Sequence, residues 1–308
     1  MALPIRISDA ARYGSLTPMY SSLLARQIEV QRQIASGMLY DSVSDNPILV
    51  GIAQRLHNED IRFTQNLRNI DEAMAFSQVT ESAMTSMVNL LQRAKELAVA
   101  GGDAAKSATD RAGLAVEVDG ILQGMIELGS QQHRGRKLFS GTLTQTDSFT
   151  ATYTAGVITG VTYNGNAEKF ATEYAPGRTI DYNILGSGAG GLFVDTISGV
   201  NVFSTLIGLR DDLQSNPANL ATRLQQVNDA LQHTVATEAN VGGVQSRLRA
   251  ATMSHEDHQE VLAATLSKLE NTDIAKAITE LNALEMSYQA ALATGARISQ
   301  LSLVNYMR

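Results

Sequence analysis

Cysteine and tryptophan are absent from this chain of 308 residues, and aromatic residues make up only 5% of it. Without cysteine the protein forms no disulfides and uses no thiolate chemistry. Lysine and arginine number 24 against 31 acidic residues, so the net charge is −7, and no basic cluster stands out. We therefore expect neither nucleic acid nor a membrane as a partner, because nucleic acids and anionic membranes attract basic surfaces. The first residues, Met1 to Arg6, lack the apolar run of a signal peptide, which argues against Sec-type secretion.

Charged side chains are nearly missing from both ends of the chain. From Tyr13 to Ala25 there is none, and between Met286 and Met307 the only charge is Arg297. Apolar residues recur there in steps of three and four, which places them on one face of an α-helix. The polar residues between them are too many for a membrane span. The residues predicted to form an assembly interface are Leu16, Tyr20, Leu23, Val30, Ile34, Leu281, Leu284, Tyr288, Leu292, Ile298, Leu301 and Val304.

These two apolar faces suggest that the terminal helices pair with each other. An intrachain coiled coil of the N- and C-terminal helices would bury both faces, and neighbouring chains would cover what remains. The alternative is two ordinary core helices.

Helix start and stop signals divide the chain between the two ends. Gly37 is a natural end for the first helix, and Asn46 with Pro47 can begin a second one. Gly101 and Gly102 end that helix, and Gly242 with Gly243 interrupt a later one. The predicted internal helices cover residues 47–100, 109–128, about 202–215 and 218–271.

Between Ser140 and Val200 the apolar pattern alternates with period two, which indicates strands. Asn164-Gly165 and Pro176-Gly177 lie between the alternating runs, where hairpin turns are expected. The sequence therefore predicts a mainly α protein with a small β insertion. The predicted architecture is a rod-like antiparallel bundle of long helices with an N- and C-terminal coiled coil plus an inserted antiparallel β-domain.

Three predicted domains follow from these boundaries. They are terminal coiled-coil segments at residues 1–45 and 271–308, a long-helix rod domain at 46–139 and 201–270, and a β-rich outer domain at 140–200.

Two motifs invite a chemical interpretation, and neither is supported by its surroundings. Gly186, Gly188 and Gly191 have the GxGxxG spacing of a dinucleotide loop, but such a loop must open a helix within a βαβ unit. His255 and His258 belong to a charged run on a long helix, which usually forms a solvated face, and zinc would require further ligands. We therefore predict no catalytic residue, no cofactor and no metal site.

Several short motifs resemble the flagellin superfamily. Toward the N-terminus these are QIASG at 33–37, SDNP at 44–47 and LLQRAKELAVA at 90–100. Toward the C-terminus they are VGGVQSRLRA at 241–250 and ISQLSLVNY at 298–306. A further segment, GRKLFSGTLTQTDSF at 135–149, is similar to the branch of the superfamily that joins the hook to the filament. A compact filament-forming flagellin is the alternative within the family.

The resemblance implies a structural subunit of the bacterial flagellum rather than an enzyme. It would form the junction ring that joins the hook-side junction protein to the flagellin filament. The implied partners are copies of itself, the hook-side junction protein, flagellin, and a cytoplasmic export chaperone on the C-terminal helix. The resemblance also implies export through the flagellar type III apparatus without a cleaved signal peptide, and hence an extracellular location. A soluble enzyme would instead require a pocket with convergent polar groups.

Two structural expectations accompany this interpretation. The terminal segments, residues 1 to about 40 and 272–308, are expected to be disordered in the isolated monomer, because their apolar faces lack partner chains. A free extracellular binding module would instead have ordered termini. The insertion at 140–200 is expected to be replaceable by a Gly/Ser linker while the helices stay folded, because its ends would meet at one tip of the bundle.

Overall fold

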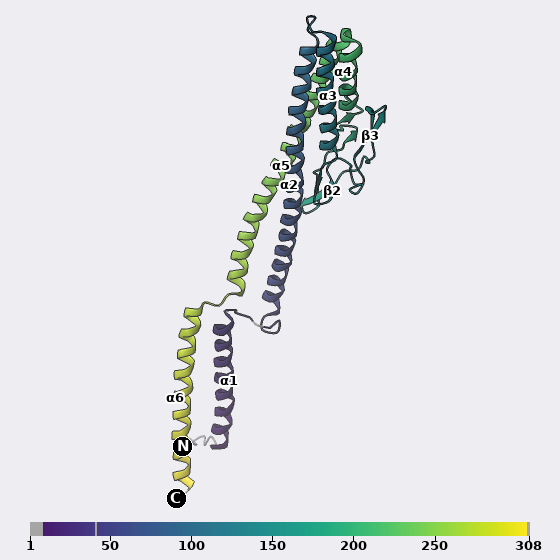
Figure 1. Cartoon of the computed structure of the whole chain (residues 1–308). Helices are drawn as coiled ribbons and strands as arrows, with labels where there is room; N and C mark the ends of the chain where they lie inside the picture. The colour runs from purple at the N-terminus through teal and green to yellow at the C-terminus, as the bar shows by residue number, and fades with distance from the viewer. Residues whose placement is uncertain (1–8, 41, 307–308) are drawn as a thin grey trace. The chain divides into compact units, whose positions relative to one another are not determined.

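The computed structural model in Figure 1 describes residues 9–40 and 42–306 of the chain. Its contacts divide the chain into two compact units, one formed by residues 63–256 and the other by residues 1–62 together with 257–308. Two long helices, α2 (Pro47–Gly101) and α5 (Leu220–Glu270), contribute to both units. The structure is mainly helical with a small strand-containing insertion, which confirms the predicted fold class.

The ends of the first helices follow the predicted capping signals. The helix α1 (Asp9–Ser36) ends before Gly37, whose positive φ of 71° is accessible to glycine at little cost. The side chain of Asn46 accepts a hydrogen bond of 3.2 Å from the amide of Leu49 and so caps α2. Ser107 and Asp110 form a reciprocal capping box at the start of α3 (Ala108–Gly129).

Within residues 63–256, α2 and α5 run antiparallel to each other. Three side-chain hydrogen bonds join them, Gln245 to Glu81 at 2.8 Å, Thr85 to Glu238 at 2.7 Å and Lys95 to Asn228 at 2.9 Å. Along α2 these residues rise in number, whereas their partners on α5 fall in number, which is the order expected for an antiparallel pair. Buried apolar side chains line both helices, among them Ile70, Phe76, Met84, Met87 and Leu91 of α2 and Val227, Val241 and Leu248 of α5.

The helix α5 continues through Gly242 and Gly243 without a break, so the predicted interruption is wrong. A glycine inside a helix costs roughly 1 kcal/mol relative to alanine, which is a weak penalty. The neighbouring side chains Val241, Gln245 and Leu248 are all buried, and their packing outweighs that local cost.

Residues 132–195, which comprise most of the insertion and the segment just before it, contain eight short strands. They are β1 (Gln132–His133), β2 (Arg136–Lys137), β3 (Phe149–Thr154), β4 (Val157–Tyr163), β5 (Ala171–Ala175), β6 (Arg178–Asp181), β7 (Ser187–Gly188) and β8 (Val194–Asp195). Among the described residues they form four separate two-stranded sheets, three antiparallel and one, β7 with β8, parallel. The insertion is therefore a set of small ladders rather than one antiparallel sheet.

Only one of the two predicted hairpin turns is correct. Pro176-Gly177 joins β5 to β6 as expected, with Gly177 at a φ of 68°. The turn between β3 and β4 is formed by Ala155 and Gly156, with φ values of 53° and 84°. Asn164-Gly165 follows β4 instead, where the Asn164 amide donates to the carbonyl oxygen of Asp147 and to the hydroxyl of Thr150.

The insertion shares its core with the helices around it. The ring of Phe193 lies 5.3 Å from that of Phe139, 4.7 Å from that of Phe149 and 5.1 Å from that of Phe203, the last of which belongs to α4 (Val202–Ser215). On α2, Phe76 lies 5.5 Å from Tyr182 of the insertion. Residues 140–200 fall in the same compact unit as the adjoining helices.

Candidate assembly interface

The terminal helices α1 and α6 (Ile274–Tyr306) lie side by side in the unit formed by residues 1–62 and 257–308, as Figure 1 shows. The less exposed positions recur in alternating steps of three and four on both helices, which is the heptad pattern of a coiled coil. On α1 they include Tyr20, Leu23, Gln27, Val30 and Ile34, and on α6 Ala277, Leu281, Leu284, Tyr288, Ala291 and Gly295. We call these residues the terminal seam. The predicted pairing of the two terminal helices is therefore confirmed.

Small residues allow α1 and α6 to approach closely at the Tyr20 end of the terminal seam. The hydroxyl of Tyr20 donates a hydrogen bond of 2.7 Å to the carbonyl oxygen of Ala291, and its ring meets Tyr288 edge-on at 6.4 Å. A Cβ atom on Gly295 would collide with the Tyr20 hydroxyl, so a larger residue here would displace the Tyr20 side chain. Tyr20 thus fixes the axial register of the two helices.

An ion pair also joins α1 to α6 along the terminal seam. The guanidinium of Arg26 donates hydrogen bonds of 3.0 and 2.8 Å to one carboxylate oxygen of Glu280, which raises the pKa of Arg26 above its ordinary value. Both side chains are more than a third exposed, so the pair contributes specificity of alignment more than stability.

The two segments that join this helix pair to α2 and α5 are hydrogen-bonded to each other. The amide of Leu39 donates to the carbonyl oxygen of Glu270 at 2.6 Å, and the amide of Thr272 donates to that of Gly37 at 2.9 Å. Asp273 caps α6 by accepting a 3.1 Å hydrogen bond from the amide of Lys276. The register of the terminal seam is therefore tied to the start of α2 and the end of α5 within the same unit.

The structure places most of the predicted interface residues in the terminal seam. Val30 is fully buried, and the half-buried residues are Tyr20, Leu23, Ile34, Leu281, Leu284 and Tyr288. Leu292 is 48% exposed and lies outside the seam, where Ala291 occupies the inward position instead. The side chains of Leu16, Ile298, Leu301 and Val304 lie outside the described part of the chain.

A second apolar set on the same two helices remains exposed. Its members are Met19, Leu24 and Ile28 on α1 and Ile274, Ile278, Met286 and Leu292 on α6, and we call it the outer apolar set. Ile278 and Leu292 stand two heptads apart, so they share one face of α6. The apolar residues of the outer apolar set are visible in the sequence. The sequence alone does not show which apolar residues face the partner helix within the chain and which face outward, because that depends on where the partner helix lies.

His255, one of the two histidines considered for a metal, serves a structural role. His255 is only 5% exposed, and its Nε2 lies 2.6 Å from the carbonyl oxygen of Tyr174, so the prediction of a solvated position is wrong for this residue. Its ring packs 5.2 Å from that of Phe63. No group of three or more metal-binding side chains is gathered anywhere in residues 9–40 and 42–306.

The GxGxxG glycines do not open a helix. Gly188 lies in β7 and Gly191 precedes β8, and the next helix, α4, starts only at Val202. The carboxylate of Asp195 accepts hydrogen bonds from the hydroxyl of Ser198 and from the amides of Ile197 and Gly190, which holds its pKa well below its usual range. The backbone amides that might cradle a phosphate are thus used by a side chain of the protein itself. None of the described helices has the length and apolar character that crossing a membrane requires.

Two family signatures cover most of the helical part of the chain. Residues 21–144 match the bacterial flagellin N-terminal helical region, and residues 224–307 match the bacterial flagellin C-terminal helical region. The chain belongs to the flagellin superfamily. Among its flagellin relatives, FlaB1 of Treponema pallidum is 21% identical over 285 residues and covers 90% of both chains. The flagellin of Bacillus subtilis is 23% identical over 300 residues, which span 92% of this chain and 94% of that one.

Solved structures of hook-associated proteins share this flagellin-superfamily fold. A putative flagellar hook-associated protein from Vibrio parahaemolyticus matches 74% of this chain and 100% of its own, with a TM-score of 0.65 and 20% identity. Flagellar hook-associated protein 3 from Legionella pneumophila matches 70% of this chain and 98% of its own, with a TM-score of 0.60 and 17% identity. As a member of this superfamily the chain is a structural subunit of the flagellum and not an enzyme.

Proposed function

We propose that this protein forms the junction ring between the hook-side junction protein and the flagellin filament. The observation that carries the proposal is its fold, because chains described as hook-associated proteins align with it over almost their whole length. The segment 135–149, which resembles the junction branch, supports the same assignment and supplies β2 and the start of β3. The protein is then exported through the flagellar type III apparatus and acts outside the cell.

The outer apolar set supplies the surface for assembly. Leu24 and Ile28 on α1 and Ile278 and Leu292 on α6 leave apolar area in water that neighbouring subunits would cover. Contacts of this heterologous kind, repeated around and along an axis, build rings and helical tubes. The partners in this arrangement are further copies of the chain, the hook-side junction protein and flagellin. Before export, a cytoplasmic chaperone would cover the same apolar residues of the C-terminal helix.

A compact filament-forming flagellin is the second candidate. The observation in its favour is that flagellins from Treponema pallidum and Bacillus subtilis align with the chain over about nine tenths of its length. Both candidates use the terminal helices for assembly, so they differ only in where the protein lies along the flagellum.

Leu292→Asp tests the assembly role of the outer apolar set. Because Leu292 is already exposed in the single chain, the variant should fold as the wild type does. At an interface the new carboxylate would be buried without a partner, which costs several kcal/mol, on top of about 1.5–3 kcal/mol of lost apolar burial. Cells should therefore shed flagellin into the medium and lose motility.

The control is Thr294→Asp, which adds the same charge to an exposed position on the opposite face of α6 from Leu292. It should leave motility unchanged. Leu301→Asp, beyond the described side chains, is expected to act as Leu292→Asp does. Normal swimming of cells that carry Leu292→Asp would contradict the proposal.

A further inference from the structure

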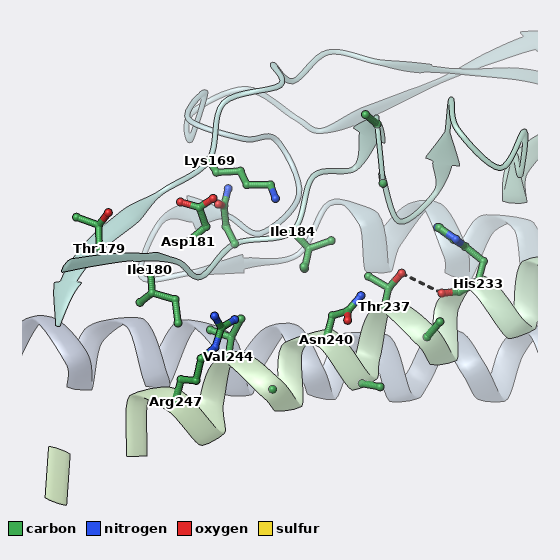
Figure 2. A pocket seen from close by; sticks show the side chains of 16 residues that line it. Lys169, Thr179, Ile180, Asp181, Ile184, His233, Thr237, Asn240, Val244 and Arg247 are labelled. Atoms are coloured by element: carbon green, nitrogen blue, oxygen red, sulfur yellow. Dashed lines mark hydrogen bonds between the residues drawn. The ribbon is translucent and has the colours of Figure 1, made fainter. Parts of the chain in front are cut away.

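A groove of about 860 Å³ lies between the insertion and α5, within residues 63–256. Figure 2 shows Lys169, Thr179 and Asp181 on the insertion side and Asn240, Val244 and Arg247 on α5. One end is closed by His233, whose Nε2 lies 2.9 Å from the carbonyl oxygen of Gly191. Several of the α5 residues that line the groove are small, with Ala236, Ala239 and Gly243 among them, which leaves space between α5 and the insertion.

The groove presents more hydrogen-bond donors than the chain satisfies. Lys169 and Arg247 line it from opposite sides, and neither forms an ion pair within residues 9–40 and 42–306. Asn183 is only 2% exposed, and its Oδ1 accepts a 2.7 Å hydrogen bond from the amide of Phe170, which fixes the orientation of its amide group. Its Nδ2 has no acceptor in the described part of the chain.

An unsatisfied buried donor costs roughly 1–3 kcal/mol, so the amide of Asn183 is better accommodated when an acceptor enters the groove. The two nearby cations favour an anionic acceptor. One carboxylate, that of Asp181, also lines the groove. Its side chain is exposed and forms no ion pair in the described residues, so it does not neutralise Lys169 or Arg247, and it would weaken the binding of an anion by repulsion.

We propose that this groove binds carboxylate side chains of a neighbouring copy, supplied by residues 256–260 of its α5. Three exposed carboxylates, those of Glu256, Asp257 and Glu260, lie within that short segment. None of the three forms an ion pair in the described part of the chain. Glu256 and Glu260 are one helical turn apart, so both project from one face of α5. The groove and the segment are therefore complementary in charge.

This contact rests on the proposed ring, which places copies of the chain next to one another. Each copy carries a net charge of −7, so two copies repel each other unless local charges of opposite sign meet. A contact between the groove and the acidic segment would therefore also favour one alignment of adjacent copies over others. The contact would thus align adjacent subunits through the insertion, at a surface separate from the terminal helices.

The test measures binding of a fluorescein-labelled peptide with the sequence of residues 252–264, held helical by a hydrocarbon staple on the face away from Glu256 and Glu260, to the full-length protein at low ionic strength. Saturable binding is expected. Lys169→Glu and Arg247→Glu should each weaken it at least about fivefold, which corresponds to about 1 kcal/mol for an exposed charge pair. Asp181→Asn should tighten it, because it removes the opposing carboxylate.

Matched controls separate the groove from general charge attraction. Lys268→Glu makes the same change on α5 outside the groove and should leave binding unchanged. A peptide with Glu256→Gln, Asp257→Asn and Glu260→Gln should bind at least about tenfold more weakly. A peptide with Glu260→Lys should bind the Arg247→Glu protein better than the wild-type peptide does.

The proposal is overturned if no saturable binding occurs, or if Lys268→Glu weakens binding as much as Arg247→Glu. Displacement of the peptide by an equal concentration of inorganic phosphate would also overturn it, because the groove would then be a general anion site. The assay uses the isolated chain, so its failure would leave the junction assignment intact. Conversely, a protein found along the filament would refute the junction ring without affecting the peptide result.

Discussion

Replacing Phe193 by alanine tests whether the insertion and the helices form one cooperative core. The side chain is fully buried, and its ring contacts Phe139, Phe149 and Phe203 at centroid distances of 4.7 to 5.3 Å. Two of these rings come from the insertion or its start, and Phe203 belongs to α4. Phe193 therefore bridges the two parts.

The expected loss is large. Truncation of a buried phenylalanine to alanine costs about 3–5 kcal/mol, because apolar burial is lost and a cavity remains. The aromatic contacts add about 0.5–1.5 kcal/mol for each favourable pair. A Cβ at Gly129 would collide with Phe149 and lie close to Phe193, so these rings pack tightly against the backbone of α3. We expect a decrease of about 4 kcal/mol or more in the free energy of unfolding.

Urea unfolding followed by far-ultraviolet circular dichroism measures the helices, and hydrogen exchange of amides in β3 and β4 measures the insertion. Both signals should shift together in Phe193→Ala. Tyr153→Ala is the control, since it removes an exposed ring from the same insertion and should change the free energy of unfolding by less than about 0.5 kcal/mol. If β3 and β4 lose protection while the helical transition stays unchanged, residues 140–200 form an independent domain and the shared-core argument is refuted. An independent domain could also be replaced by a Gly/Ser linker while the helices stay folded. If the insertion and the helices share one core, the same replacement should destabilise the helices.

Three further predictions concern single features of the structure. Because hydrogen bonds depress the pKa of Asp195, its stabilising contribution is fully present above the unfolded pKa of about 3.9 and is lost as pH falls toward the depressed value. Asp195→Asn should therefore reduce the pH dependence of the melting temperature below about pH 4, and an unchanged slope would refute the assignment. Gly295→Val should displace Tyr20 from the carbonyl oxygen of Ala291 and destabilise the terminal seam by about 1–3 kcal/mol. Thermal melts measure this loss, and Ala296→Val, a change of similar size at an exposed position, is the control. In dilute monomer, amides of residues 17–40 and 274–297 should exchange faster than those of α3, and equal protection would show that the terminal seam is stable without neighbours.

Much of the fold could be predicted because long helices carry strong local signals. The capping residue Asn46 marks the start of α2 by a mechanism that acts within one turn, and the sequence predicted it. Ser107 and Asp273 cap α3 and α6 by the same local mechanism. The apolar steps of three and four likewise indicated that α1 and α6 would pair.

The details that failed depend on contacts between distant residues. Gly242 and Gly243 suggested a helix break, but packing of α5 against α2 decides that position. The charged run around His255 suggested solvent, whereas the carbonyl oxygen of Tyr174 and the ring of Phe63 surround that imidazole. Leu292 and Ala291 are adjacent in the sequence, and only the place of Tyr20 on the facing helix determines which one enters the terminal seam.

Immuno-electron microscopy of intact flagella tests the proposed junction ring most directly. Antibodies raised against the exposed β3–β4 hairpin, which contains Tyr153, would reach their epitope without disturbing the terminal helices. The account predicts label confined to the boundary between hook and filament. Label spread along the length of the filament would contradict it and identify the protein as a compact flagellin.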